Sequence, residues 1–198
     1  MEKEFLGYHG TSSERTAKIK KHGFIKSNSK SSLPGDLGFG AYFYISRNDN
    51  DVPFENASKY VKNIKTRYED YVIIETVLSI EQDKILNLND VETKKVLEEF
   101  IEKNYDKIIS SAEKYKRTPA YNRGNFDGVA LNIFIKLLGL SVDAAIQDTH
   151  TNFDGLYKSS NFKNGREICV KNMNIIDLSN LKVTKIWTVS EVYYGYKR

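Results

Sequence analysis

The stretch YVIIETVLSI, residues 71–80, most restricts how this chain of 198 residues can fold. Branched aliphatic side chains in succession favour an extended strand, because they pack well on a pleated surface and lose side-chain freedom in a helix. A strand that is apolar on both faces must be covered on both, so it belongs inside a sheet. We therefore expect a domain built around a sheet, with this segment as a central strand.

Other segments of the chain predict further strands, separated by helices. The strand candidates are EFLGYHG (4–10), AYFYIS (41–46), DKILNL (83–88), AAIQD (144–148), REICVKN (166–172) and a long one in VTKIWTVSEVYYGY (183–196). The helix candidates are ERTAKIKKH (14–22), with Ser12 or Ser13 as its cap and Gly23 at its end, NASKYVKNIK (56–65), one long amphipathic helix within 91–115, and VALNIFIKLLG (129–139). Too few strands alternate with helices for a doubly wound sheet. The sequence predicts an α+β fold of two packed, mostly antiparallel sheets with flanking helices.

Length and composition indicate one domain spanning residues 1–198. Apolar residues make up 40% of the chain, enough for one core, and no apolar run approaches the length of a membrane span. Cys169 is the single cysteine, which excludes an intrachain disulfide and a cysteine metal cage. The N-terminus shows no signal-peptide pattern, so we expect a cytoplasmic protein without a membrane partner.

The net charge of +4 is small, but the bases are unevenly distributed. Residues 15–33 hold six Lys or Arg and no acid. Such a stretch fits either a solvated face or a surface for phosphate groups, and composition does not separate the two.

Several common chemistries are missing from the sequence. His9, His22 and His150 lack the spacing of a metal site, so we expect no metal. Neither a P-loop nor a serine-hydrolase elbow occurs, and GDLGFGAY (35–42) precedes a strand where a dinucleotide fingerprint would open a helix.

Three short pieces remain as candidates for a functional site. They are GYHGTS (7–12), GDLGFGAYFYIS (35–46) and NGREICVKN (164–172). Each alone has an ordinary structural explanation: His9 as a buried histidine, Tyr42 as core packing, and Glu167 as a carboxylate at a strand edge. Considered together, in their order along the chain, the three pieces indicate a functional site.

Taken together, these pieces resemble the ADP-ribosyltransferase superfamily, in its diphtheria-toxin-like and poly(ADP-ribose)-polymerase-like branch with a His-Tyr-Glu triad. GYHGT (7–11) is similar to the first motif, GFGAYF (38–43) to the second, and REICV (166–170) to the third. NASKY (56–60) is similar to the helix that carries a second ring-stacking tyrosine. The resemblance covers most of residues 5–172 and implies the fold of that superfamily, with a helical insertion at about 90–140 that has no counterpart.

The resemblance also implies roles for individual residues, with NAD as co-substrate. His9 is expected to bind the adenine-side ribose, and the backbone of Gly10, supported by Thr11, the nicotinamide carboxamide. Tyr42 and Tyr60 are expected to enclose the nicotinamide ring. Glu167 is expected to hold the nicotinamide ribose and to stabilise the positive charge that develops as the glycosidic bond breaks. The expected activity is transfer of a single ADP-ribose unit.

There are three alternatives to this reading, and two of them differ from it at identifiable positions. RNA 2′-phosphotransferases share the YHGT-like start but end their second motif in histidine, where this chain has Tyr42. The arginine-serine-glutamate toxins need a Glu-x-Glu pair, and this chain has Gly165 in place of the first glutamate. A catalytically silent module that binds ADP-ribose or nucleic acid stays open on the same fold.

The acceptor of the ADP-ribose is expected to face the loop FDGLYKSSNFKNGR (153–166). Aromatic and basic residues alternate there, a mixture that suits stacking on bases and contact with phosphates, and also suits a protein surface. The sequence slightly favours RNA or DNA over protein as the acceptor, for an intracellular toxin or defence effector with an antitoxin as a possible partner. The residues expected to face the acceptor are Tyr157, Lys158, Phe162, Lys163 and Arg166.

Overall fold

The apolar segment 71–80 lies within the longest strand, β3 (Asp70–Glu81). In the computed structural model, which describes residues 1–24, 32–118, 121–153 and 162–188, β3 pairs with β1 (Glu2–Thr11) on one side and β7 (Lys182–Thr188) on the other. Side chains on both of its faces are buried from Val72 to Ile74, whereas from Thr76 to Ile80 only one face is buried and Val77 on the other is exposed. The prediction of an internal strand is confirmed.

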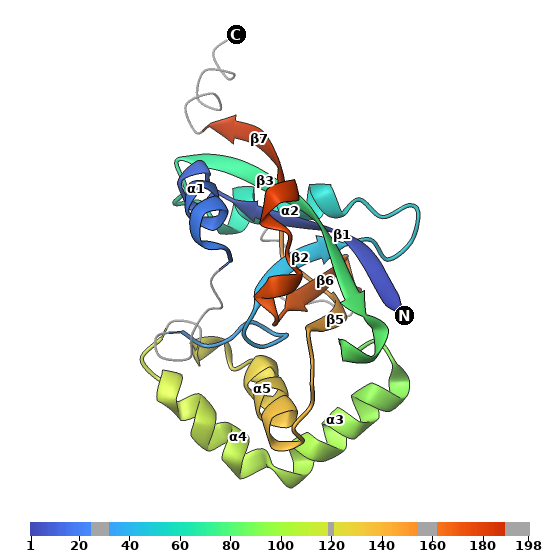
Figure 1. Cartoon of the computed structure of the whole chain (residues 1–198). Helices are drawn as coiled ribbons and strands as arrows, with labels where there is room; N and C mark the ends of the chain where they lie inside the picture. The colour runs from blue at the N-terminus through green and yellow to red at the C-terminus, as the bar shows by residue number, and fades with distance from the viewer. Residues whose placement is uncertain (25–31, 119–120, 154–161, 189–198) are drawn as a thin grey trace.

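The described strands form one seven-stranded mixed sheet in the order β4-β5-β6-β2-β1-β3-β7 (Figure 1). β2 (Ala41–Ile45), β5 (Ala144–Thr149) and β6 (Gly165–Val170) pair antiparallel with their neighbours, whereas β4 (Ile85–Asn87) runs parallel to β5. The α+β class is confirmed. The prediction of two packed sheets is wrong for the described residues, because β1 and β2 are hydrogen-bonded and join both halves.

The junction between β1 and β2 is narrow. Its strand register holds one residue pair, Tyr8 with Tyr44, whereas β1 pairs with β3 along its whole length from Glu2 to Thr11. Beyond Tyr8 the strands therefore separate: His9–Thr11 continue along β3, and β2 continues along β6. Among the described residues, this pair is the register that connects β4-β5-β6-β2 to β1-β3-β7.

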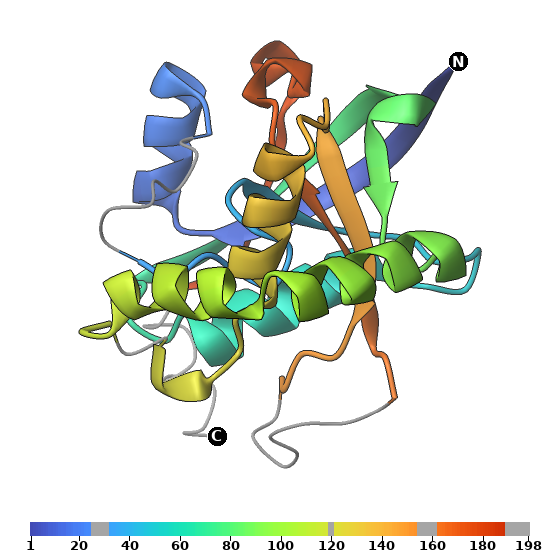
Figure 2. The same cartoon turned by 90° about the horizontal axis from the view of Figure 1, so that it is seen from below.

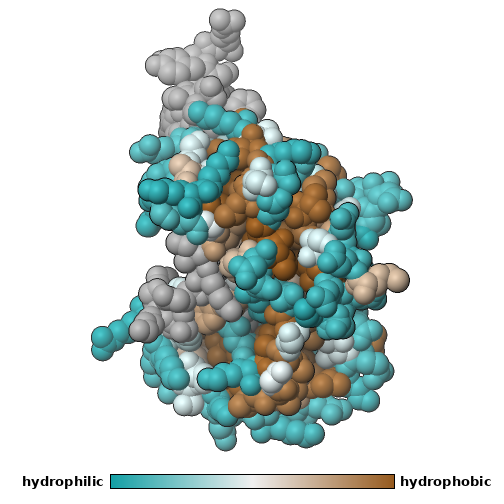
Figure 3. Space-filling view, viewed as in Figure 1, coloured by the Kyte–Doolittle hydropathy of each residue, from teal (hydrophilic) through white to brown (hydrophobic). Residues whose placement is uncertain are grey.

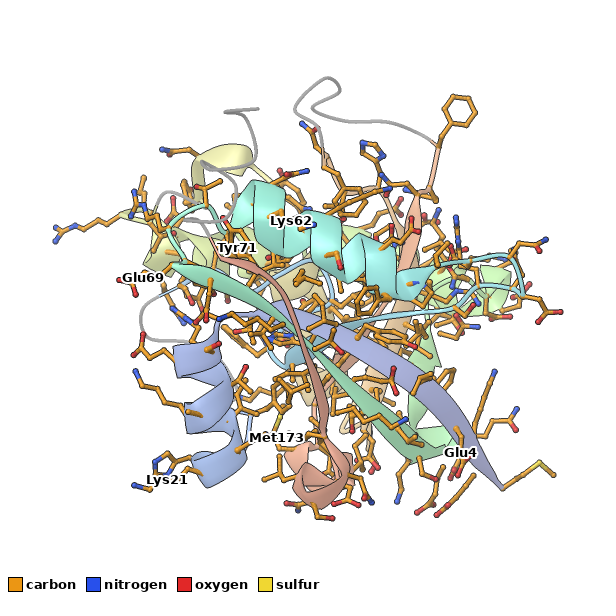
Figure 4. The ribbon with its side chains drawn as sticks, turned by 90° about the horizontal axis from the view of Figure 1, so that it is seen from above. Glu4, Lys21, Lys62, Glu69, Tyr71 and Met173 are labelled. Carbon is orange, nitrogen blue, oxygen red and sulfur yellow. The ribbon has the colours of Figure 1, made fainter. Side chains whose placement is uncertain are left out.

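Two helices cover the part of the sheet near this junction. α1 (Ser13–His22) is capped by the Ser12 hydroxyl, which accepts a hydrogen bond from Arg15 N, and it ends at Gly23, whose φ is +78°. α2 (Pro53–Ile64) begins with proline, which suits the first turn of a helix, and packs across β1, β2 and β3 (Figure 4, where Lys62 marks α2 and Lys21 marks α1). Both helices occur where the sequence predicts them.

α-Helices occur within residues 91–112 and at 127–137, but the long helix expected within 91–115 is two helices. α3 (Val91–Lys103) ends at Asn104, whose side-chain amide donates to Phe100 O at 2.9 Å, and α4 (Tyr105–Ala112) follows. An asparagine that bonds the preceding turn competes with the helical backbone, which explains the break. α3 and α4 form an arc below the sheet, and α5 (Asp127–Leu137) lies between that arc and the sheet (Figure 1); in the view from below, α3 and α4 run across the front of the molecule (Figure 2).

Each face of the sheet has its own core. Phe43, Ile74 and Leu78 are buried on one side, which we call the Phe43 face, together with Phe24 after α1. On the opposite Tyr44 face, α2 covers Tyr44 and Ile73, and α5 covers β5 and β6. Hydrophobic residues also reach the surface over the part of the molecule where Figure 1 places α5 (Figure 3).

No helix in the described part of the chain has the length and apolar composition needed to cross a membrane. β7 ends at Thr188, so the remainder of the long strand expected over 183–196 lies outside the described residues.

Candidate functional site

A cavity of about 400 Å³ opens where β1 and β2 separate. Its walls include His9, Gly10 and Thr11 from β1, and residues 40–44 at and before β2. Tyr60 from α2 and Glu167 from β6 also line the cavity. Every residue that the sequence singled out for catalysis or NAD binding therefore lines one cavity, with a volume in the range of small-molecule sites.

The strand register explains how Glu167 reaches this cavity. Glu167 pairs with Tyr44, and two residue pairs further along the strands Cys169 pairs with Tyr42, so all four side chains project from the Tyr44 face. Tyr42 and Cys169 pack in the cluster beneath α5, and Tyr44 packs in the cluster beneath α2. Glu167 lies on the same face as both clusters.

His9 reaches the same cavity from the opposite face of the sheet. Its ring packs against Phe24 and Phe43, with centroids 5.3 and 5.7 Å away. Continuous pairing between β1 and β2 would separate His9 from Glu167 by the thickness of the sheet. The separation of the two strands after Tyr8 removes that barrier, so both side chains line one space.

The His9 ring has a defined hydrogen-bonding state. Its Nδ1 lies 2.8 Å from the carbonyl oxygen of Tyr42. A carbonyl only accepts, so Nδ1 carries the proton and the neutral ring keeps a lone pair on Nε2. Burial lowers the His9 pKa, the Tyr42 carbonyl opposes this, and the charges of Lys65 and Arg15 lower it further. His9 is therefore a neutral acceptor for a ligand hydroxyl.

Glu167 has a strongly altered proton affinity. Burial in the cavity raises its pKa to about 7, the charge of Asp36 adds to the rise, and the nearby hydroxyl groups of Thr149 and Tyr44 work in the opposite direction. A carboxyl group with a pKa near neutrality is a marker of functional sites. A cation bound beside Glu167 would favour its ionised form.

Tyr42 is the pocket residue that is held most firmly. Its hydroxyl accepts a hydrogen bond from Leu37 N at 3.0 Å and donates one to Gly38 O at 2.7 Å. Burial is the main cause that raises its pKa, so the phenol stays protonated. The hydroxyl is thus occupied by the chain before β2, which leaves the ring as the part of Tyr42 available to a ligand.

Tyr60, the second predicted stacking residue, lies among aromatic and cationic side chains. Its ring is 6.2 Å from that of Tyr44 and has the Lys65 ammonium 5.4 Å from its centroid. Nearby, the Arg15 guanidinium lies 5.2 Å from the Tyr68 centroid. Both cations line the cavity, and no carboxylate of the described residues is within ion-pair distance of either.

Sequence reasoning missed these cations and the rings beneath them. It left the basic residues of 15–33 open between a solvated face and a phosphate surface, whereas Arg15, Lys18 and Ile19 line the cavity. Their spacing of three and four residues puts them on one face of α1, and this was a usable signal. Lys65 and Tyr68 follow α2 without a periodic pattern, so nothing in the sequence marked them.

Gly10 and Thr11 are placed by packing as well as by the cavity. A β-carbon on Gly10 would lie 2.6 Å from Ala57 O and 2.9 Å from the Val61 side chain, both in α2. Gly10 thus permits α2 to approach β1, and a ligand can meet its backbone only along the strand edge. Thr11 is buried and lines the cavity beside it.

The residues expected to face an acceptor are only partly described. Tyr157 and Lys158 lie outside the described residues. Phe162 is 86% exposed, and Lys163 beside it is exposed while its carbonyl accepts from Arg47 Nη1. The Arg166 guanidinium donates to both carboxylate oxygens of Asp148, at 2.6 and 3.2 Å, so its charge is compensated inside the fold.

A search of the described residues finds no group of three or more His, Cys, Asp or Glu side chains arranged to hold a metal ion. The chain matches no protein-family model, and neither the curated proteins nor the solved structures contain a match to it. The geometry of the cavity residues is therefore what indicates the chemistry of the site.

Proposed function

We propose that this protein is an NAD-dependent mono-ADP-ribosyltransferase with the ADP-ribosyltransferase fold. The observation that carries the proposal is the distribution of charge within one cavity. Arg15 and Lys65 line the cavity and lower the His9 pKa, whereas the carboxyl group that lines it is Glu167, whose pKa Asp36 raises from outside the lining. NAD⁺ has the matching distribution, with a positive nicotinamide ring and a negative diphosphate joined through ribose hydroxyls.

The cationic part of the cavity suits the diphosphate. Arg15 and Lys65 are held against tyrosine rings and lack carboxylate partners among the described residues, so their charge is available to an anion. Lys18 lines the same cavity, although it also pairs with Glu14. The Nε2 lone pair of neutral His9 can accept from a ribose hydroxyl, the role that the resemblance gives it.

The carboxylate part of the cavity suits the nicotinamide ribose. Breaking the bond between the ribose carbon and the ring nitrogen sends the bonding electrons to nicotinamide, which leaves neutral, and positive charge builds up on the sugar. The Glu167 carboxylate stabilises that charge from a position set by the β2–β6 register. An acceptor nucleophile then attacks the same carbon and releases its proton. The Tyr42 and Tyr60 rings are suited to enclose the leaving nicotinamide.

The acceptor is proposed to be a macromolecule in the cytoplasm, with a nucleic acid slightly favoured over a protein. The described part of the 153–166 loop supports an acceptor role through the exposed Phe162 ring and the neighbouring Lys163. A toxin or defence effector of this type is expected to have a neutralising partner.

Nicotinamide release from NAD by the purified protein tests the proposal, with Glu167→Gln as the matched variant. Release by the wild type alone supports it. Binding of ADP-ribose without release by either protein would indicate the silent module, and removal of phosphate from 2′-phosphorylated RNA would indicate a phosphotransferase. Incubation of a cell lysate with labelled NAD, followed by separate nuclease and protease digestion, then identifies the acceptor class.

A further inference from the structure

The turn at residues 35–38 lies directly before β2 and is closed by a hydrogen bond from Gly38 N to Gly35 O at 2.8 Å. The Tyr42 hydroxyl fills the inside of this turn through its bonds to Leu37 N and Gly38 O. A β-carbon on Gly35 would lie 2.6 Å from that hydroxyl, so the fit leaves no free space. Because its hydroxyl is bonded to the turn, the position of the turn determines the position of the Tyr42 ring.

Two side chains hold the turn from outside. The Lys171 ammonium donates to Leu37 O at 2.7 Å and lies 3.5 Å from Phe39 O. The Asn132 side-chain oxygen, from α5, accepts from Phe39 N at 3.2 Å. A residue just after β6 and a residue in the helical insertion thus hold the same short stretch of backbone.

The packing between α5 and the turn is equally close. A β-carbon on Gly128 would lie 1.8 Å from Gly35 O, and one on Gly38 would lie 2.5 Å from the Asn132 side-chain oxygen. The φ of Gly38 is +84°, which disfavours any other residue there. The turn has no room to shift toward the helix.

Asn132 contributes an acceptor in spite of an energetic cost. Its Nδ2 atom is buried and has no hydrogen-bond partner among the described residues. Leaving a buried donor unpaired costs free energy, so stability alone does not account for an amide side chain here. What the position supplies is the oxygen that holds Phe39.

We propose that Asn132 and Lys171 are positioning residues of the nucleotide pocket, which fix Tyr42 through the turn at 35–38. The helical insertion, for which the family resemblance offers no counterpart, then acts on the pocket through the contact of α5 with the turn, without lining the cavity itself. The consequence for ligand binding rests on the proposed function, whereas the mechanical link between α5 and Tyr42 does not.

The test compares Asn132→Leu and Lys171→Met, which remove the contacts, with Asn132→Asp, which keeps an acceptor near the Lys171 ammonium. Val129→Ala is the control for lost core volume in α5, because its side chain shares a cluster with Leu33 and Phe39 but makes none of the hydrogen bonds to the turn. The affinity for a non-hydrolysable carbocyclic NAD analogue is measured by titration calorimetry, and hydrogen exchange of residues 33–42 by mass spectrometry.

We expect Asn132→Leu and Lys171→Met to weaken analogue binding about tenfold and to accelerate exchange in residues 33–42 about tenfold. Asn132→Asp and Val129→Ala should remain near the wild type in both measurements. Unchanged exchange in the first two variants, or an equal change in Val129→Ala, would overturn the proposal. A wild type that does not bind the analogue refutes the proposed function alone, because the exchange measurement still decides the link to the turn.

Discussion

His9 Nδ1 lies 2.8 Å from the carbonyl oxygen of Tyr42, and this hydrogen bond spans the place where β1 and β2 separate. The bond uses a side chain to connect two strands whose backbones no longer pair there. It also fixes the tautomer of the ring, which leaves Nε2 as an acceptor. One contact thus links the division of the sheet to the chemistry of the cavity.

Replacing His9 by alanine removes both the bridge and the acceptor. We expect the affinity for the carbocyclic NAD analogue to fall about tenfold, the equivalent of about 1.4 kcal/mol for a lost hydrogen bond to a ligand hydroxyl. Lys21→Ala, exposed on α1, is the control. Calorimetry measures both variants, and an unchanged affinity in His9→Ala would contradict the role assigned to His9.

The pH dependence of activity should follow Glu167. Its raised pKa of about 7 means that the carboxylate needed for catalysis forms only as the pH rises through neutrality. We expect kcat/KM for NAD to rise about tenfold per pH unit below 7 and to level off above it. The lowered pKa of His9 places its titration on the acid side of the Glu167 limb. A profile that is flat from pH 5.5 to 8.5 would be inconsistent with Glu167 as the ionised catalytic group.

The same shift predicts how Glu167→Gln affects stability. The folded protein holds the Glu167 proton more tightly than the unfolded chain, whose pKa is near 4.5, so this contribution is full below pH 4.5 and is lost as the pH rises to about 7. Glutamine does not titrate and avoids that loss. Relative to the wild type, Glu167→Gln should gain up to about 3 kcal/mol in unfolding free energy between pH 4.5 and 8. Urea unfolding at several pH values measures the gain, and a constant difference would indicate an ordinary pKa.

The cations held against tyrosine rings should discriminate between NAD and nicotinamide. We expect Arg15→Ala and Lys65→Ala each to raise the KM for NAD about tenfold through loss of a contact to the diphosphate. The inhibition constant of nicotinamide, which has no phosphate, should stay unchanged. Lys59→Ala, on the exposed side of α2, serves as the control for general charge. Equal effects on both ligands would place the two cations away from the diphosphate.

Much of the fold could be predicted from local patterns, because strands and helices follow from periodicity and caps. The 71–80 strand, the Ser12 cap and the Gly23 end of α1 are of this kind. The single pairing of Tyr8 with Tyr44 was beyond reach, because register between strands distant in sequence depends on the whole packed sheet. The break at Asn104 was missed because the apolar spacing continues across it.

The residues of the candidate site likewise divide into those that sequence motifs mark and those that only the folded structure shows. His9, Tyr42, Tyr60 and Glu167 could be selected because motif order marked them, and the structure brings them to one cavity. Lys65 could not be selected, because its relevance comes from the Tyr60 ring beside it. Contacts between residues far apart in sequence, such as Asn132 with Phe39, leave no periodic trace.

Gly10 is where packing and ligand access meet, and its substitution separates them. A methyl group there would lie 2.6 Å from Ala57 O and 2.9 Å from the Val61 side chain, so α2 must move. We expect Gly10→Ala to lower the unfolding free energy by about 1–3 kcal/mol and to abolish detectable binding of the NAD analogue, because Tyr60 moves with α2. Val61→Ala, which loses volume at the same contact without pushing the helix, should cost similar stability yet keep binding. Equal loss of binding in both would show that stability, and not the placement of α2, controls the pocket.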